Sequence, residues 1–404
     1  MGLANIAPYF LIMAALALLG HLIVRGWPFY ADLTAQTQGR LSALDGFRGF
    51  LATGVFFHHA LHVLIFEQSG EWRGPPSDFY LFIGEGMVIF FFMITGVLFW
   101  SRVLEGKLTA RRLLVSRVRR LYPMYLFSFL LIAIVALVLA GFKIQETPTQ
   151  LAGEIGRWLA GGLCGSPALN GIRTTRINSD VTWTLYYEWI FYLALPLLGL
   201  LFKGGRFLWL CGLVAVWYAV TRYSHHYGAM RETLVYLPFL CGMATAYLKY
   251  QESLQQRLRH WSYTLVMIAL LIAAVPAFGS DRINRGWTVI FLMFPVFAGV
   301  VAGNNLFGLL TTRWASFLGH VSYSVYLLHG IVIFCLLQLL GVFMPLSQVQ
   351  PWQFWLYCLP MGLAVVGISA LTYRWVEAPF LVPPRKQSSL TRPVAEEPVS
   401  ATRT

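Results

Sequence analysis

The feature that most limits the fold of this chain is a series of apolar stretches, each about long enough to cross a lipid bilayer. A membrane-spanning helix needs about 20 predominantly apolar residues, and backbone polar groups in lipid must be satisfied within the span, which favours helices. The 404 residues contain eleven such stretches, at roughly 8–25, 44–66, 79–100, 121–141, 183–202, 206–222, 234–250, 261–278, 287–303, 317–342 and 353–376. The sequence therefore predicts an all-α polytopic membrane protein with about eleven transmembrane helices.

Composition argues against the other broad classes of protein. Charged residues make up 12% of the chain and hydrophobic residues 57%, whereas soluble globular chains are about 25% charged. Too few polar groups remain for a soluble enzyme, a disordered chain or a nucleic-acid-binding domain. The cysteines form no CxxC pair and indicate neither a disulfide framework nor a zinc site; they are Cys164, Cys211, Cys241, Cys335 and Cys358.

Three parts can be distinguished along the chain. The first apolar stretch lacks a preceding basic segment and a small-residue cleavage site, so it is interpreted as a helix rather than a signal peptide. Residues 1–40 are then an extra N-terminal transmembrane helix with its linker, and residues 41–380 are the membrane domain. The polar residues 381–404 predict a disordered cytoplasmic tail.

Positive charge sets the expected orientation in the membrane. Segment 101–120 holds seven basic residues against the single acid Glu105, and such segments stay on the cytoplasmic side. Alternating outward from it places 20 of the 30 basic residues in the cytoplasm, with the N-terminus outside. The net charge of +13 thus reflects topology rather than a nucleic-acid partner. Segment 142–182 becomes the longest external loop, of a length that is often functional.

The second apolar stretch, LDGFRGFLATGVFFHHALHVLIF from Leu44, holds several ionisable residues. Such residues at membrane depth are costly and mark functional sites by default. On a helix Arg48 and His59 differ by about 20° in azimuth and lie about 16 Å apart along the axis. They share one face, where a cation and an imidazole can hold an anionic donor and a reacting hydroxyl together.

Other interpretations of this stretch stay open. Arg48 can extend to the interface while the histidines pair with neighbouring carbonyls. His58 points away from the shared face, which favours a structural role. His58 and His62 have the i, i+4 spacing of metal ligands, but no HExxH pattern or nearby carboxylate supports a metal, and we expect none.

Two further strings contain candidate ligands for a phosphate-bearing donor such as coenzyme A. In RRLLVSRVRRLYPMY, Arg117 and Arg120 lie one helical turn apart, and arginine forks suit phosphate oxygens. The alternative is charge that only sets topology or contacts lipid headgroups. In FFFMITG, Thr95 and Gly96 allow a thin ligand arm, or simply another helix, to approach closely.

The string WTLYYEWIFYLALP opens the fifth stretch on the external side. Its aromatic residues suit the membrane interface, but Glu188 within them requires a partner, and a carboxylate beside aromatic faces suits a sugar acceptor. Near the end of the chain, LGHVSYSVYLLHG contains His329, which fits a core position as well as a ligand position.

Taken in order, these strings resemble the bacterial acyltransferase family 3, integral-membrane enzymes that O-acylate carbohydrates and other envelope molecules. The resemblance covers about residues 41–380. It rests on LDGFRG with the Arg48-x10-His59 spacing, on FFMITG, on Arg117 and Arg120 before LYP, and on WTLYYEWIFY, LGHVSYSVYLLH and YRWVEAPF. It implies a ten-helix core, to which the first apolar stretch is an addition.

The resemblance also implies an activity and roles for the residues. An acyl group, expected to be acetyl, passes from acyl-coenzyme A (acetyl-CoA) to a hydroxyl of a carbohydrate or glycolipid such as lipopolysaccharide O-antigen, capsule or exopolysaccharide, in the bacterial inner membrane. His59 is general base or transient acyl acceptor, and Arg48 binds donor phosphate or oxyanion. The coenzyme is held by Arg117, Arg120 and Thr95, and Glu188 orients the acceptor.

Some features depart from the family pattern. Thr95 replaces the usual serine, Ile89 stands where an aspartate is frequent, and Gly330 follows His329 in place of a bulky residue. We expect no fused SGNH domain, so transfer finishes within the membrane domain or on a separate partner. The alternatives are a secondary transporter or flippase with a proton relay, although no interrupted helices at matching positions support it, and acylation of a small molecule or lipid.

Overall fold

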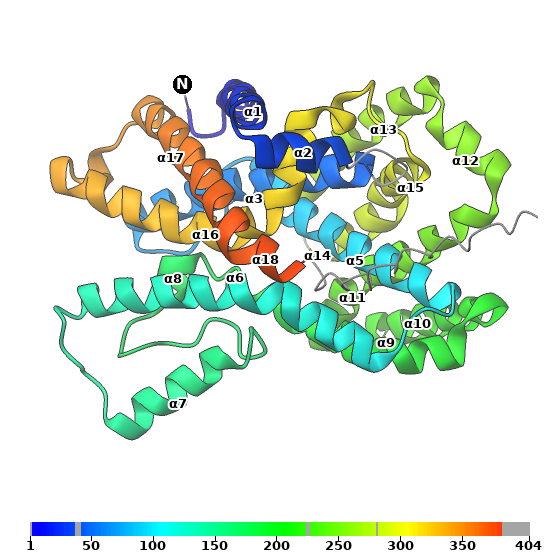
Figure 1. Cartoon of the computed structure of the whole chain (residues 1–404), viewed down its shortest axis with the longest axis horizontal. Coiled ribbons are helices and arrows are strands. Elements are labelled where there is room, and N and C mark those ends of the chain that lie inside the picture. The colour runs from blue at the N-terminus through cyan, green and yellow to red at the C-terminus, as the bar shows by residue number, and fades with distance from the viewer. Residues whose placement is uncertain (1, 37–41, 224–226, 280–281, 382–404) are drawn as a thin grey trace, which may run out of the picture.

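The computed structural model describes residues 2–36, 42–223, 227–279 and 282–381, and within these ranges the chain is built of helices and loops (Figure 1). The described residues form no β-strand; an isolated bridge joins Leu169 and Ile172. The predicted linker residues 37–40 and all of the predicted tail except Leu381 lie outside the described residues.

The helices follow the apolar stretches of the sequence. Within the described ranges, nine helical segments are long and apolar enough to cross a membrane: Ala7–Gly26 (α1), Ser42–Ser69 (α3), Asp78–Leu104 (α4, η1 and α5), Ala110–Leu139 (α6), Trp183–Phe202 (α9), Trp261–Gly279 (α13 and η4), Arg285–Ala302 (most of α14, with η5 and α15), Arg313–Phe343 (α16) and Pro351–Leu381 (α17, η8 and α18). The other two stretches lie on α10 (Phe207–Tyr223) and on α11 (Tyr227–Thr245) with η3 (Ala246–Tyr250). The prediction of an all-α polytopic membrane protein is confirmed.

Four helices of twelve residues or fewer connect these segments: α2 (Pro28–Gln36), α7 (Pro148–Leu159), α8 (Thr175–Asn178) and α12 (Glu252–Arg259). Three segments have π-helical turns, namely η1 (Phe82–Gly86), η5 (Val289–Met293) and η8 (Tyr373–Glu377). Such turns redirect side chains relative to a regular helix and occur frequently at functional sites. Both η1 and η8 pack beside residues of the site described below.

Helices α3 and α16 meet at the centre of the bundle because glycines let their backbones approach (Figure 1). A Cβ atom on Gly49 would lie 2.6 Å from the Leu318 side chain, and one on Gly319 would lie 1.9 Å from the carbonyl oxygen of Asp45. Any larger residue would separate the helices at these points. Small residues at such crossings are the usual means by which membrane helices pack closely.

The long loop 142–182 is folded onto the membrane helices rather than standing free. Figure 1 shows its helix α7 at the edge of the bundle, beside α6. The Trp158 ring of α7 stacks on Phe129 of α6 at 5.2 Å, and the buried Glu154 carboxylate accepts a hydrogen bond from the Asn170 backbone at 2.7 Å. The loop then runs through α8 against α16 into the start of α9.

Candidate active site

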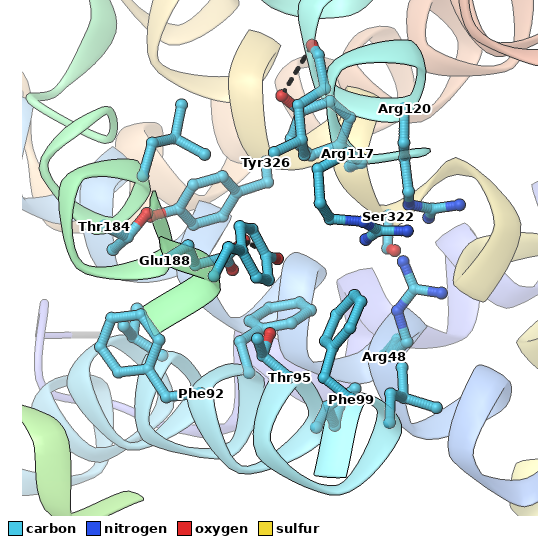
Figure 2. Close-up of a pocket in the computed structure, with 18 of the residues that line it drawn as sticks. Arg48, Phe92, Thr95, Phe99, Arg117, Arg120, Thr184, Glu188, Ser322 and Tyr326 are labelled. Carbon is cyan, nitrogen blue, oxygen red and sulfur yellow. Dashed lines mark hydrogen bonds between the residues drawn. The ribbon is translucent and has the colours of Figure 1, made fainter. Parts of the chain in front are cut away.

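A cavity of about 240 Å³ lies among α3, α5, α6, α9 and α16; we call it the central cavity. Figure 2 shows side chains from each of these helices pointing into it. Five of the six residues predicted for the site line this cavity, although they come from four separate helices: Arg48, Thr95, Arg117, Arg120 and Glu188. The sixth, His59, does not line it.

Four arginines form one end of the central cavity, which we call the arginine end: Arg48, Arg102, Arg117 and Arg120. In Figure 2 the guanidinium groups of Arg48, Arg117 and Arg120 gather on the same side. Their charges are only partly matched by acids. Arg48 lies 3.5 Å from Asp45 and Arg120 lies 3.9 Å from Glu377. The guanidinium of Arg117 packs over the Phe99 ring at 4.7 Å, and its Nε is buried with no hydrogen-bond partner among the described residues.

Beyond the arginine end lies a wider depression of about 680 Å³. It shares Arg102, Arg117 and Arg120 with the central cavity, and its further basic residues, Arg111, Arg112 and Arg119, come from the start of α6. A cluster of arginine side chains with few acidic side chains beside it favours phosphate oxygens as ligands. We call this region the arginine depression.

The rest of the central cavity combines apolar walls with a few fixed polar groups. Its walls include Val88, Phe91, Phe92 and Leu98 of α5. The Glu188 carboxylate accepts a hydrogen bond from the Tyr192 hydroxyl at 2.6 Å. This gives Glu188 the partner that its place among aromatic residues required.

Tyr326 forms the far wall of the cavity and is held in place by two contacts. Its hydroxyl lies 2.9 Å from the Thr184 hydroxyl and donates to the Val181 carbonyl at 3.0 Å. The Tyr326 ring lies 6.1 Å from Phe91 and 6.0 Å from His329. Tyr326 therefore lines the central cavity and also neighbours His329 of the histidine cluster.

The sequence suggested that Thr95 and Gly96 allow close approach of either a ligand arm or another helix. In the structure the two residues have different environments. Thr95 lines the central cavity, as expected for contact with a ligand arm. Gly96 faces away, and a Cβ atom there would lie 2.3 Å from the Phe239 carbonyl oxygen of α11. Ordinary close packing of helices explains Gly96.

His59 belongs to a cluster of four histidines: His58, His59, His62 and His329. Its ring centroid lies 5.2 Å from that of His329 on α16 and 6.2 Å from that of His62. The face of α3 that carries Arg48 and His59 thus extends from the central cavity to the histidine cluster. Arg48 lines the central cavity, whereas His59 lies outside its lining and beside His329.

His58 has a structural environment. Its Nδ1 lies 2.9 Å from the Tyr80 carbonyl oxygen, which accepts a hydrogen bond from it. A Cβ atom on Gly84 would lie 2.2 Å from the ring, so the glycine in the π-helical turn η1 makes room for His58. The direction of His58 on the helix predicted such a role.

The histidines His58, His59 and His62 are also the candidate metal donors in the described part of the chain. Their ring nitrogens lie within 4.8 Å of one another. Nitrogens that share one tetrahedral zinc ion lie about 3.3 Å apart, from bonds of about 2.0–2.1 Å. Metal analysis of the purified protein distinguishes a metal site from a group of neutral imidazoles.

Sequence reasoning missed two features near the site. The Glu377 side chain is fully buried beside Arg120 and accepts a hydrogen bond from Ser324 at 3.1 Å. Ser179 and Asp180 both have positive φ, 54° and 55°, and Ser179 packs against Gly330 next to His329. Burial raises the pKa of Asp180. The sequence signal for Glu377 is that it is the one acid in YRWVEAPF. No sequence pattern indicates the positive φ of Ser179 and Asp180.

Fold and comparison together define a class of protein, the multi-pass membrane acyltransferases. The family model Acyl_transf_3, which describes an acyltransferase domain, matches residues 41–374. The chain belongs to this acyltransferase 3 family, as its motifs indicated. No curated protein and no solved structure matches the chain significantly.

Proposed function

We propose that this protein is an inner-membrane O-acyltransferase that transfers an acyl group, expected to be acetyl, from acyl-coenzyme A to a hydroxyl of a cell-envelope carbohydrate. The observation that carries the proposal is the joining of the arginine depression to a narrow apolar cavity that ends at Tyr326. An arginine-rich region followed by an apolar cavity matches a donor that has phosphates at one end and a thin thioester arm at the other.

The donor would bind from the cytoplasmic side, where positive charge places the arginine depression. Coenzyme A phosphates would contact Arg117 and Arg120, and the thioester arm would lie between Phe91, Phe92 and Thr95. Arg48 would bind the innermost phosphate or the developing oxyanion. The volume of the central cavity is close to the lower limit of small-molecule sites, which suits an extended arm better than a bulky ligand.

The chemistry would occur where the thioester passes Tyr326 and approaches His59. A thioester needs little activation, so the protein contributes a base for the acceptor hydroxyl and donors for the oxyanion. His59 is the proposed base, or a transient acyl acceptor. Glu188, fixed by Tyr192, would orient the acceptor. Carbohydrates, lipids and small molecules all offer suitable hydroxyls, and the family resemblance favours the first.

Purified protein in nanodiscs, incubated with labelled acetyl-CoA, tests this proposal. Slow hydrolysis of the thioester, absent in His59→Ala, is the expected result, because water replaces the missing acceptor. A secondary transporter or flippase, the second candidate, also suits intramembrane arginine, histidine and glutamate residues. It would leave acetyl-CoA intact, and that outcome would reject the enzyme.

Removing either donor arginine should weaken donor binding more than catalysis. Arg117→Ala and Arg120→Ala each lose a phosphate contact that persists from the bound substrate to the transition state, so KM for acetyl-CoA rises while kcat changes little. Steady-state kinetics of hydrolysis measure both. Arg206→Ala, in the loop before α10 and outside the arginine depression, is the control. If KM were unchanged in both variants, Arg117 and Arg120 would not bind the donor, and their charge would serve only the membrane topology.

A further inference from the structure

The pair formed by His59 and His329 indicates what orients the proposed base. The titratable side chains that influence His59 are His58, His329 and His62, so the described residues supply no carboxylate to this set. In hydrolase triads a carboxylate holds the imidazole in the right tautomer. A membrane-embedded histidine with no such acid requires another acceptor for its second nitrogen.

The protonation of His329 follows from its hydrogen bond. Its Nδ1 lies 3.0 Å from the carbonyl oxygen of Val325, one turn earlier on α16. A carbonyl oxygen only accepts, so Nδ1 carries the hydrogen. Nε2 is left with a lone pair, and within the described part of the chain it is buried without a hydrogen-bond partner. A buried acceptor without a donor is unfavourable, so this nitrogen is available to a neighbour.

His59 has the complementary requirement. Its Nδ1 is buried and has no hydrogen-bond partner in the ranges that the structure describes, although the ring as a whole is only half-buried. The two rings are 5.2 Å apart between centroids and inclined by 33°. We propose that His329 is the positioning residue for His59: its Nε2 accepts the Nδ1 hydrogen of His59 and thereby keeps the His59 lone pair on Nε2. This inference rests on the proposed function of His59 as general base.

Atoms and charges balance in the resulting reaction. Nε2 of His59 takes the proton of the acceptor hydroxyl while the hydroxyl oxygen bonds to the thioester carbon. The carbon–sulfur bond then breaks, and the proton passes from Nε2 to the coenzyme thiolate. His329 keeps its own hydrogen on Nδ1 and transfers none. A neutral imidazole in this position also avoids burying a further charge at membrane depth.

His62 is the competing partner and provides the control. Both of its nitrogens are buried, and no described residue forms a hydrogen bond with either of them. Its ring, however, lies 6.2 Å from His59, farther than His329, and packs against Trp72 at 4.2 Å. Among the described residues, none fixes the tautomer of His62 by a hydrogen bond, whereas the Val325 carbonyl fixes that of His329.

Hydrolysis of acetyl-CoA by the full-length protein in nanodiscs provides the test, with His329→Gln compared with His329→Asn. The glutamine amide oxygen reaches the position of Nε2 and can accept the His59 hydrogen, whereas asparagine is one methylene shorter and cannot. We expect His329→Gln to stay within about 10-fold of the wild type and His329→Asn to lose about 10²-fold or more in kcat at unchanged KM. His62→Gln should retain activity.

The outcomes separate this inference from the proposed function. If His329→Asn is fully active, or if His329→Gln is as impaired as His329→Asn, the inference is wrong. It is also wrong if His62→Gln is the inactive variant, or if the purified protein holds a stoichiometric metal whose removal by a chelator stops hydrolysis. If wild type and His59→Ala hydrolyse acetyl-CoA equally, the proposed function itself fails.

Discussion

Replacing His59 by alanine should lower turnover about 10²- to 10⁴-fold, the usual contribution of a general base. The reason is its position: the proposed function places the thioester beside His59, whose ring is only half-buried and lies 5.2 Å from that of His329. A loss well beyond this range would favour an acyl-histidine intermediate, since the covalent route would then disappear with the nucleophile. Rates of thioester hydrolysis and of acyl transfer, measured at equal protein levels, give the fold loss of turnover.

The neighbouring residue is a demanding control for this experiment. His58 is rotated by about 100° from His59 on the helix, and it donates to the Tyr80 carbonyl instead of facing His329. His58→Asn keeps a donor near the position of Nδ1 and should retain folding and most activity. If His58→Asn were inactive and His59→Ala active, the helix register that links His59 to Arg48 would be wrong.

The sequence was sufficient for the helices and for the grouping of most candidate residues. Apolar length alone predicted the spans, because a segment of this kind has no stable alternative in lipid. The candidates Arg48, Thr95 and Glu188 were chosen separately from three different spans, and all three line the central cavity. Ionisable or small polar residues in otherwise apolar helices are rare enough that they mark a site without any knowledge of packing.

What the sequence could not provide depends on contacts between distant helices. His59 was expected beside the donor, yet it does not line the central cavity, whereas Tyr326 lines the cavity and neighbours His329. The position of Tyr326 is set by Thr184 and Val181, which the folded loop 142–182 and α9 bring to α16. Helical periodicity describes one helix at a time and carries no information on such a wall.

The same limit applies to Glu377. It lies in the π-helical turn η8, which changes the direction of side chains relative to the 3.6-residue period used to interpret the sequence. Its neighbours Arg120 and Ser324 come from α6 and α16. The acid was visible in YRWVEAPF, but its two partners were not.

Breaking the Glu377–Arg120 pair should destabilise the protein and weaken donor binding together. The Glu377 side chain is fully buried and that of Arg120 is 25% exposed. Loss of one partner from a buried pair costs about 3–5 kcal/mol, because the other charge is left uncompensated; the exposure of Arg120 favours the lower part of that range. Glu377→Leu should therefore lower the unfolding temperature and raise KM for acetyl-CoA. Glu71→Gln, in an exposed pair with Arg73, should change neither.

A double variant separates the two effects of Glu377. A buried ion pair replaced by apolar side chains is often as stable as the original, so Glu377→Leu with Arg120→Leu should recover much of the unfolding temperature. Donor binding should not recover, because the phosphate ligand is missing from the arginine end. Thermal unfolding and acetyl-CoA kinetics on the same preparations provide both values. If the double variant were as unstable as Glu377→Leu, the acid would act through Ser324 rather than through Arg120; if its KM returned to the wild-type value, Arg120 would not bind the donor.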